Sequence, residues 1–186
     1  MTAVPNQKMT VADFLNWVDA LPGDGRYELD RGVPVAMAPG TAQHVRAIMA
    51  AANALAAAIK SANSPCEVFI DGPGVQIDDS TAYIPDVSLN CGERLPDDAR
   101  FLTNPIVVIE VLSPSTKRMD KHIKLNGYFK IASIRHYAVV DLADRIVFHH
   151  RRGENGLILT AILRDGDLVL DPPGLSFPLV ALFEAG

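Results

Sequence analysis

Residues 106–112, with the sequence IVVIEVL, constrain the fold more than any other part of the chain. All of them are apolar except Glu110. An apolar run of this length, rich in β-branched residues, predicts a strand covered on both faces, and therefore a sheet with helices on either side. An unpaired ionised carboxylate is costly to bury, so Glu110 must be neutralised, be paired with a cation, or hold a metal ion.

The other hydrophobic patterns predict helices and strands around this segment. Thr10 and Asp13 have the spacing of a capping box at the start of a helix over 10–21. The DRG sequence at 30–32 predicts the turn of a hairpin over 26–39. Two further helices are expected over 41–60 and 115–133, and strands over 66–70, 74–78, 82–90, 104–113, 134–141, 145–152, 157–163 and 167–170.

This order of elements predicts a single domain over residues 1–186. It is an α/β sheet with helices on its faces rather than a strictly alternating dinucleotide-binding pattern. The length suits one domain, and no linker or repeat interrupts it. The helix over 41–60 is expected to bury an apolar stripe made of Val45, Ile48, Ala52, Leu55 and Ile59.

Composition and missing motifs narrow the functional classes. The formal net charge of −5 argues against tight, non-specific binding of nucleic acid, although a metal ion and a local basic patch can offset it. The chain contains no Walker A loop, GxGxxG, GxSxG or HExxH motif, which argues against the enzyme classes that these define.

The ends and the cysteines carry expectations about location. The start of the sequence has no apolar signal segment, and the apolar run over 47–59 is short for a membrane span, so we expect a cytoplasmic protein outside the membrane. Cys66 and Cys91 do not form a CxxC pair. In the cytoplasm we expect them to be reduced thiols, with a disulfide as the alternative.

Two carboxylates stand out by their context. Asp86 follows Pro85 among strand-forming residues, 24 positions before Glu110. If the two strands are neighbours, both carboxylates lie at adjacent positions, and their oxygens suit Mg²⁺ or Mn²⁺. The alternative is that Asp86 begins a turn and Glu110 pairs with an Arg or Lys in the core.

Lys124 follows Glu110 by 14 residues, on the next predicted helix. A strand-to-helix return would bring its ammonium back to the carboxylates, where it could stabilise charge or orient a water molecule. The alternative is a surface ion pair with Asp120. Glu28, in the first strand of the hairpin, is either a solvated strand residue or a ligand.

Three basic side chains are candidates for contacting phosphate. His44 opens the second helix and could bind phosphate or accept a proton, or it could be structural. Lys117 and Lys121 could line a phosphate-contacting face, or a solvated basic helix face.

The segments YIPDVSLNCGER and NPIVVIEVLSPSTKRMDKHIKLNGYFK, at 83–94 and 104–130, resemble the Uma2 family of restriction-endonuclease-like proteins. This family belongs to the PD-(D/E)XK nuclease superfamily. The resemblance implies a restriction-endonuclease-like α/β core, with a mixed central sheet flanked by helices, an N-terminal helix and hairpin, and a β-rich C-terminal part.

The resemblance also implies roles for individual residues. Asp86 and Glu110 match the metal-binding acidic pair. Leu112 stands where the superfamily usually has a lysine, and Lys124 matches a lysine moved onto the following helix. Glu28 matches an acidic position that completes the site, and His44 matches a histidine after the first hairpin.

Three hypotheses follow. The first is a Mg²⁺- or Mn²⁺-dependent endonuclease that hydrolyses DNA. The second is a catalytically silent nuclease-fold module that binds nucleic acid or protein, and the third is a dimeric structural protein. Under each of them we expect a homodimer, because the β-rich C-terminal part would otherwise leave sheet edges exposed.

Overall fold

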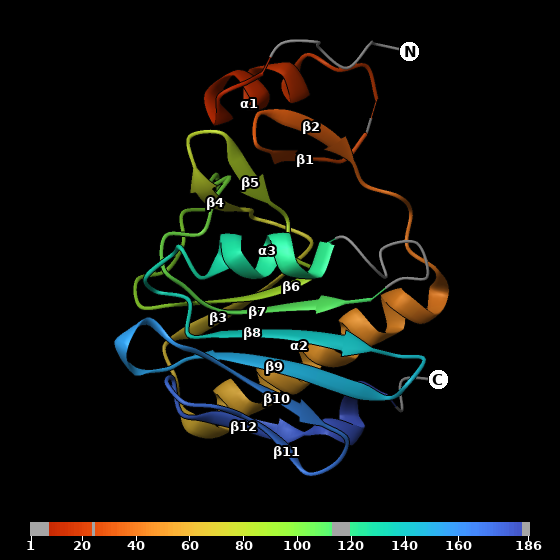
Figure 1. Ribbon diagram of the computed structural model, residues 1–186, viewed down its shortest axis with the longest axis vertical. Helices are drawn as coiled ribbons and strands as arrows, with labels where there is room; N and C mark the ends of the chain where they lie inside the picture. Colours follow the sequence, from red (N-terminus) through yellow and green to blue (C-terminus); the bar gives the residue numbers. More distant parts are fainter. Residues whose placement is uncertain (1–7, 24, 113–119, 184–186) are drawn as a thin grey trace.

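The computed structural model describes residues 8–23, 25–112 and 120–183, and within helix α3 it describes side chains from Lys124 onward. Its main sheet has six strands in the order β10-β9-β8-β7-β6-β3 (Figure 1). β7 and β8 run parallel and all other neighbours are antiparallel, so the sheet is mixed, as expected. The strands are β3 (Cys66–Ile70), β6 (Val87–Cys91), β7 (Pro105–Val111), β8 (His136–Asp141), β9 (Ile146–Arg152) and β10 (Ile158–Leu163).

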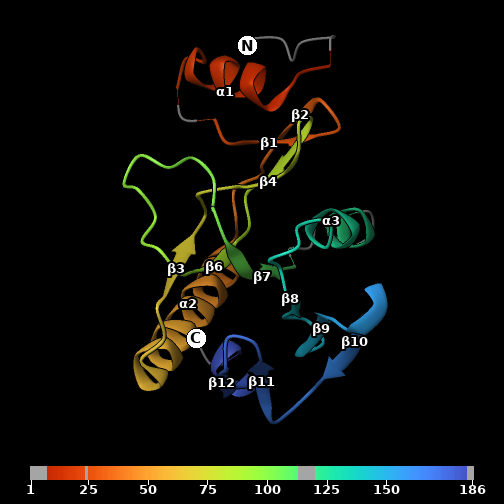
Figure 2. The same ribbon diagram turned by 90° about the vertical axis from the view of Figure 1, so that its left-hand side faces the viewer.

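Two helices cover opposite faces of this sheet. Helix α2 (Ala42–Ala62) packs on the face that carries Val107 and Ile109, while α3 (Asp120–Tyr128) packs on the face that carries Val108 (Figure 2). Because a helix covers each face, the apolar side chains on both faces of β7 are buried, as predicted. Glu110 alternates onto the α3 face, the same face as Val108.

A second sheet lies beyond α3 (Figure 1). Its four strands have the order β2-β1-β5-β4, and helix α1 (Val11–Asp19) packs against it, with the predicted capping box of Thr10 and Asp13 in place. Its strands are β1 (Tyr27–Asp30), β2 (Val33–Ala36), β4 (Val75–Asp78) and β5 (Thr81–Tyr83).

The strand expected over 82–90 is in fact two strands in different sheets. β5 belongs to the second sheet and β6 to the main sheet, and residues 84–86 connect them without pairing. Pro85 lies in this connection and has no N–H to donate to a ladder, which favours a break here. The break places Asp86 at the junction of the two sheets.

The C-terminal part adds a hairpin against the α2 face. β11 (Asp167–Leu170) was expected, but its partner β12 (Leu175–Pro178) was not, because four residues ending in proline give a weak strand signal. Short 3₁₀ turns lie at Glu154–Gly156 and Leu179–Leu182. Leu168, Leu170 and Phe177 join the core under α2.

Two sequence-based expectations about the core are wrong. Val45 is 50% exposed, and Ala47 and Ala51 are buried in its place. The face of α2 that packs on the sheet is therefore rotated relative to the predicted stripe. Its small side chains let the helix approach the sheet closely. The cysteines form a disulfide rather than reduced thiols. Cys66 and Cys91 are directly opposite in the antiparallel β3–β6 ladder, which brings their sulfur atoms together.

Helix α2 is also the single described helix long and apolar enough to meet the length and hydropathy criterion for a membrane span. In this fold its buried side packs against the main sheet and the C-terminal hairpin, through Ala47, Ile48, Ala51, Ala52 and Leu55.

Candidate active site

The β6–β7 ladder brings Asp86 to Glu110. Val87, the first residue of β6, is opposite Ile109, so Asp86, which directly precedes β6, lies beside the end of β7 that carries Glu110. Asp86 Oδ2 accepts a hydrogen bond of 2.7 Å from the Val111 amide. The adjacency that the sequence suggested for these two carboxylates is therefore present in the structure.

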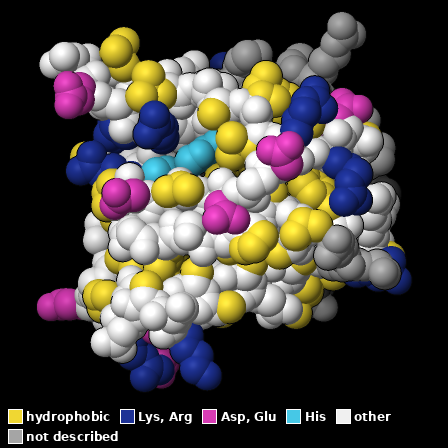
Figure 3. All heavy atoms as spheres, turned by 90° about the horizontal axis from the view of Figure 1, so that it is seen from below, with side chains coloured by type: hydrophobic (Ala, Val, Ile, Leu, Met, Phe, Trp, Pro, Cys, Tyr) yellow, Lys and Arg dark blue, Asp and Glu magenta, His cyan; other side chains and the backbone are white. Residues whose placement is uncertain are grey.

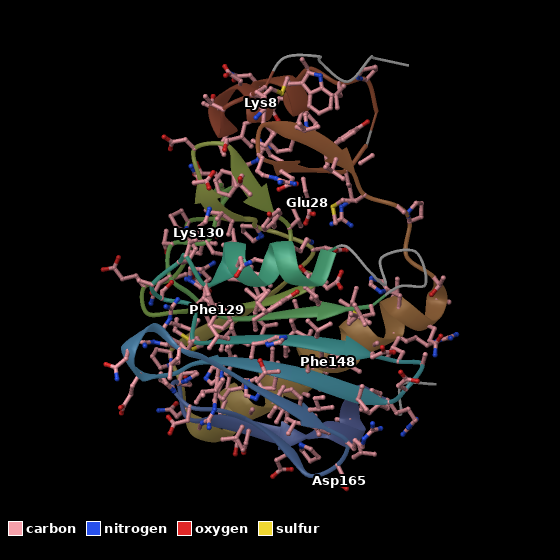
Figure 4. All side chains as sticks on the ribbon, in the orientation of Figure 1. Lys8, Glu28, Phe129, Lys130, Phe148 and Asp165 are labelled. Carbon is pink, nitrogen blue, oxygen red and sulfur yellow. A yellow bond between two sulfur atoms is a disulfide. The ribbon has the colours of Figure 1, made fainter. Side chains whose placement is uncertain are left out.

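Lys124 lies between two carboxylates from different sheets. Its Nζ is 2.9 Å from Glu28 Oε1 and 3.2 Å from Glu110 Oε1, and only 8% of the residue is exposed. Glu28 is also buried, and its Oε1 accepts a hydrogen bond of 2.8 Å from the Ile84 amide. In Figure 4 Glu28 lies between the second sheet and α3. Neither residue is the solvated surface group that their sequence context also allowed.

Tyr128 completes this cluster. Its hydroxyl donates a hydrogen bond of 2.9 Å to Glu110 Oε1, and the residue is fully buried. Residues four apart share one face of a helix, so Lys124 and Tyr128 both point from α3 toward β7. We refer to Glu28, Asp86, Glu110, Lys124 and Tyr128 as the junction cluster.

Burial governs the charge of Glu110. It raises the pKa of the Glu110 carboxyl to about 7, and the nearby ammonium of Lys124 opposes this rise while Asp86 and Glu28 add to it. Burial likewise raises the pKa of Tyr128 well above its usual value, so that hydroxyl stays protonated and remains a donor. Glu110 is therefore poised between its neutral and ionised forms near neutral pH.

His44 lies beside Asp86 in the first turn of α2. Its Nε2 is 3.4 Å from Asp86 Oδ1, and this contact raises the pKa of the imidazole against the opposing effect of burial. Its Nδ1 is buried and has no hydrogen-bond partner among the residues that the structure describes. The imidazole is thus held toward the junction cluster by Asp86.

The cluster suits a hard divalent cation. Within residues 8–23, 25–112 and 120–183, no group of three or more His, Cys, Asp or Glu side chains could hold a metal ion by itself. Mg²⁺ commonly takes only one or two carboxylates and completes its octahedral shell with water and substrate phosphate oxygens. Asp86 and Glu110 fit this need, since a cation would favour the ionised form that burial of Glu110 disfavours.

Comparison with known proteins assigns the chain to a family. The model of the Uma2 family, described as putative restriction endonuclease, matches residues 11–181. The chain belongs to the Uma2 family. The crystal structure of a putative nuclease of the DUF820 group from Anabaena variabilis superposes with a TM-score of 0.75 at 18% identity, over 95% of this chain and 98% of that one. The predicted restriction-endonuclease-like α/β fold is confirmed.

Curated relatives of this Uma2 chain come from Synechocystis. The uncharacterized protein slr1290 is 29% identical over 121 residues, which are 64% of each chain. The uncharacterized protein sll1609 is 29% identical over 101 residues, 52% of this chain and 57% of its own length. The chain thus spans about three fifths of the length of these relatives.

The structure gathers Glu28, Asp86, Glu110 and Lys124, with His44 at the border of the group. Lys117 lies outside the described residues, and Lys121 lies in α3 with its side chain outside them. Sequence reasoning missed Tyr128 as a member of the cluster. Its position four residues after Lys124 was the signal that it shares the same helix face.

Proposed function

We propose that this Uma2 protein is a metal-dependent endonuclease that hydrolyses DNA phosphodiester bonds, with residues 1–186 acting as one domain. The observation that carries the proposal is the junction cluster, in which two sheets and α3 each supply a buried ionisable side chain. Strongly perturbed ionisable groups gather at functional sites more often than elsewhere. A site built from both sheets also supports their acting as one unit.

Asp86 and Glu110 are the residues that would hold Mg²⁺ or Mn²⁺. When bound, such an ion supplies Lewis-acid activation of a water molecule and of the scissile phosphate. Tyr128 and the Val111 amide orient the two carboxylates, each through a hydrogen bond to one oxygen. Fixed carboxylates bind an ion without first losing side-chain freedom.

Lys124 is the proposed source of positive charge for the reacting phosphate. Glu28 holds its ammonium at 2.9 Å, and the Ile84 amide holds Glu28 in turn. An ammonium fixed in a buried site can donate to a phosphate oxygen or to the attacking water with little reorganisation. His44 is proposed to contact phosphate, as are Lys117 and Lys121.

The test is metal binding and cleavage in matched variants. Mg²⁺ and Mn²⁺ titration calorimetry and nicking of supercoiled plasmid would be measured for wild type, Asp86→Asn and Glu110→Gln. Asp98→Asn, which removes an exposed carboxylate outside the cluster, serves as the control. We expect both cluster variants to lose metal binding and cleavage, and the control to keep them. Unchanged cleavage in both cluster variants would reject the assignment.

A second function follows from the charge balance of the cluster. Lys124 already contacts Glu28 and Glu110, so the site has a cation of its own. This observation favours a catalytically silent module that binds nucleic acid. Salt-dependent DNA binding without cleavage in either metal would support it.

We also propose that the protein acts in the cytoplasm, where DNA is accessible. Disulfides are uncommon in that compartment, so the Cys66–Cys91 disulfide makes a direct test of the location necessary. Cell fractionation with detection of the protein by antibody would provide it, and recovery of the protein outside the cytoplasmic fraction would reject the proposed location.

A further inference from the structure

The two edges of the main sheet differ in how they are protected. At one edge β3 is partly buried, and Glu67 Oε2 accepts a hydrogen bond of 3.0 Å from the Leu95 amide in the loop beside it. At the other edge β10 pairs only with β9. Five of its six residues are exposed and the sixth is half-buried, so both faces of the strand reach solvent.

β10 lacks the features that usually prevent edge strands from associating. A charge or a proline within an edge strand discourages pairing with another chain. The sequence of β10, ILTAIL, contains neither. Each other edge strand that the structure describes contains one of them: Pro34 in β2, Glu67 in β3, Asp78 in β4, Asp167 in β11 and Pro178 in β12.

The exposed side chains of this edge are aliphatic. Leu157, just before the strand, is 61% exposed, Ile162 is 59% exposed, and Ile158 and Leu159 are about two fifths exposed, at 38% and 42%. Figure 3 views the molecule from the side of β10, β11 and β12, and hydrophobic side chains reach the surface over much of this face. Isolated exposed apolar residues are ordinary, but a row of them along an open edge marks an interaction site.

We infer that β10 is a homodimer interface, in which it pairs antiparallel with β10 of a second copy across a two-fold axis at Thr160. A two-fold axis normal to the sheet sets a central residue opposite its own copy, and residues equally distant from it opposite each other. With Thr160 at the centre, Ile158 lies opposite Ile162 and Leu159 opposite Ala161. Threonine pairs and aliphatic pairs are both favourable across antiparallel strands.

The flanking charges complement this arrangement. Residues 151–156 (RRGENG), before the strand, carry two arginines and one glutamate, a formal charge of +1, and residues 164–167 (RDGD), after it, carry one arginine and two aspartates, a formal charge of −1. Antiparallel pairing brings the negative end of one copy toward the positive end of the other, and the symmetry repeats this contact. Opposite charges at the rim favour a defined register over a slipped one. The partner is thus a second copy of this chain, joined by an uncharged centre and oppositely charged ends.

The inference is tested by charge reversal at the axis. Thr160→Lys and Thr160→Glu each place like charges directly opposite each other, and both remove the same hydrogen bond to His150. Sedimentation equilibrium should give wild type a mass twice 20.1 kDa. Each variant alone should be monomeric, and an equimolar mixture should form a Lys–Glu heterodimer, which a variant that merely misfolded could not do.

Val33→Lys is the matched control, because Val33 is also an exposed β-branched residue on an edge strand, at 49% exposure on β2. It should remain dimeric. A monomeric wild type would overturn the inference, as would a dimer that persists in Thr160→Lys. Failure of the mixture to dimerise would reject the register centred on Thr160. None of these outcomes depends on metal binding or cleavage, so the dimer and the proposed nuclease stand or fall separately.

Discussion

This Uma2 protein contains two clusters of buried polar side chains, and they differ in how their hydrogen bonds and charges are satisfied. In the C-terminal half, His136 Nδ1 lies 3.0 Å from His149 Nε2, and His136 Nε2 lies 2.9 Å from the Pro172 carbonyl oxygen. A carbonyl can only accept, so His136 Nε2 carries the proton and its Nδ1 accepts from His149. Both hydrogen bonds are therefore made with the two imidazoles uncharged. The junction cluster instead contains three carboxylates and one lysine, whose ammonium contacts Glu28 and Glu110.

The difference shows what burial alone does to ionisable groups. Burial lowers the pKa of His149 to about 4 and raises the pKa of Glu110 to about 7, so it favours the neutral form in both places. Both ring nitrogens of His136 have partners, and through them this histidine ties the turn that contains Pro172 to the main sheet. The carboxylates would gain from a further cation. Buried polar residues therefore indicate function only where their charges remain unbalanced.

The largest expected effect comes from removing the lysine. Lys124→Met leaves Glu28 and Glu110 buried without their cation, and should lower the free energy of unfolding by about 3–5 kcal/mol. Urea unfolding in EDTA would measure it. Adding Mn²⁺ should restore more stability to this variant than to wild type. Equal stability of the variant and wild type in EDTA would mean that the lysine does not balance the cluster.

The two groups should give stability opposite dependences on pH. Glu110 has a raised pKa in the folded state, so its contribution is full below its unfolded value of 4.5 and is lost as pH rises through about 7, by about 3 kcal/mol in all. His149 has a lowered pKa, so its contribution is full above 6.5 and is lost as pH falls toward about 4.

Unfolding in EDTA between pH 4.5 and 7 would separate these contributions. In Glu110→Gln the stability should rise more with pH than in wild type, because the opposing contribution of Glu110 is absent. In His149→Leu the stability should fall more with pH than in wild type, because the opposing contribution of His149 is absent. Parallel profiles for the two variants would show that one of the groups does not titrate as its surroundings indicate.

A smaller effect is expected from breaking the neutral pair. His149→Leu leaves His136 Nδ1 as a buried acceptor without a donor, which should cost about 1–3 kcal/mol at neutral pH. The affinity for Mn²⁺, measured by titration calorimetry, should be unchanged, because the histidine pair is separate from the junction cluster. A loss of metal affinity would contradict the distinction between the two groups.

The smallest effect is expected from Tyr128→Phe. It removes one hydrogen bond to Glu110 Oε1 and keeps the ring, so the free energy of unfolding should fall by about 1 kcal/mol. Metal affinity should fall modestly, since Glu110 loses one of the groups that orient it. Calorimetry would show this against Tyr27→Phe, a tyrosine on the opposite, α1-facing side of the second sheet.

Local patterns predicted the fold and part of the cluster. The apolar run around Glu110 predicted a strand covered on both faces, and its spacing from Asp86 suggested neighbouring strands. Lys124 was harder, because the sequence left a surface ion pair with Asp120 open as the alternative, whereas the residue is buried against Glu28 of the second sheet. Only the tertiary placement of β1 over α3 buries Glu28 and Lys124 together.

Other features depended on pairings that the sequence does not encode locally. The Cys66–Cys91 disulfide follows from the register of β3 with β6, which no spacing rule supplies. Val45 was assigned to the inward stripe by its apolar character and spacing, but Ala47 and Ala51 are buried in its place. The partner of His149 is His136, which comes from the adjacent strand, and no local pattern in the sequence indicates this contact.

The break at residues 84–86 has a practical consequence. Because the chain passes there from one sheet to the other, the second sheet contributes Glu28 while the main sheet contributes Glu110. Trp17, the single tryptophan of the sequence, packs edge-on against Tyr27 with 4.9 Å between the ring centroids, and Tyr27 directly precedes Glu28 in the chain. The protein thus contains its own optical reporter on the second sheet, and its fluorescence should change if Tyr27 moves together with Glu28 as the site fills.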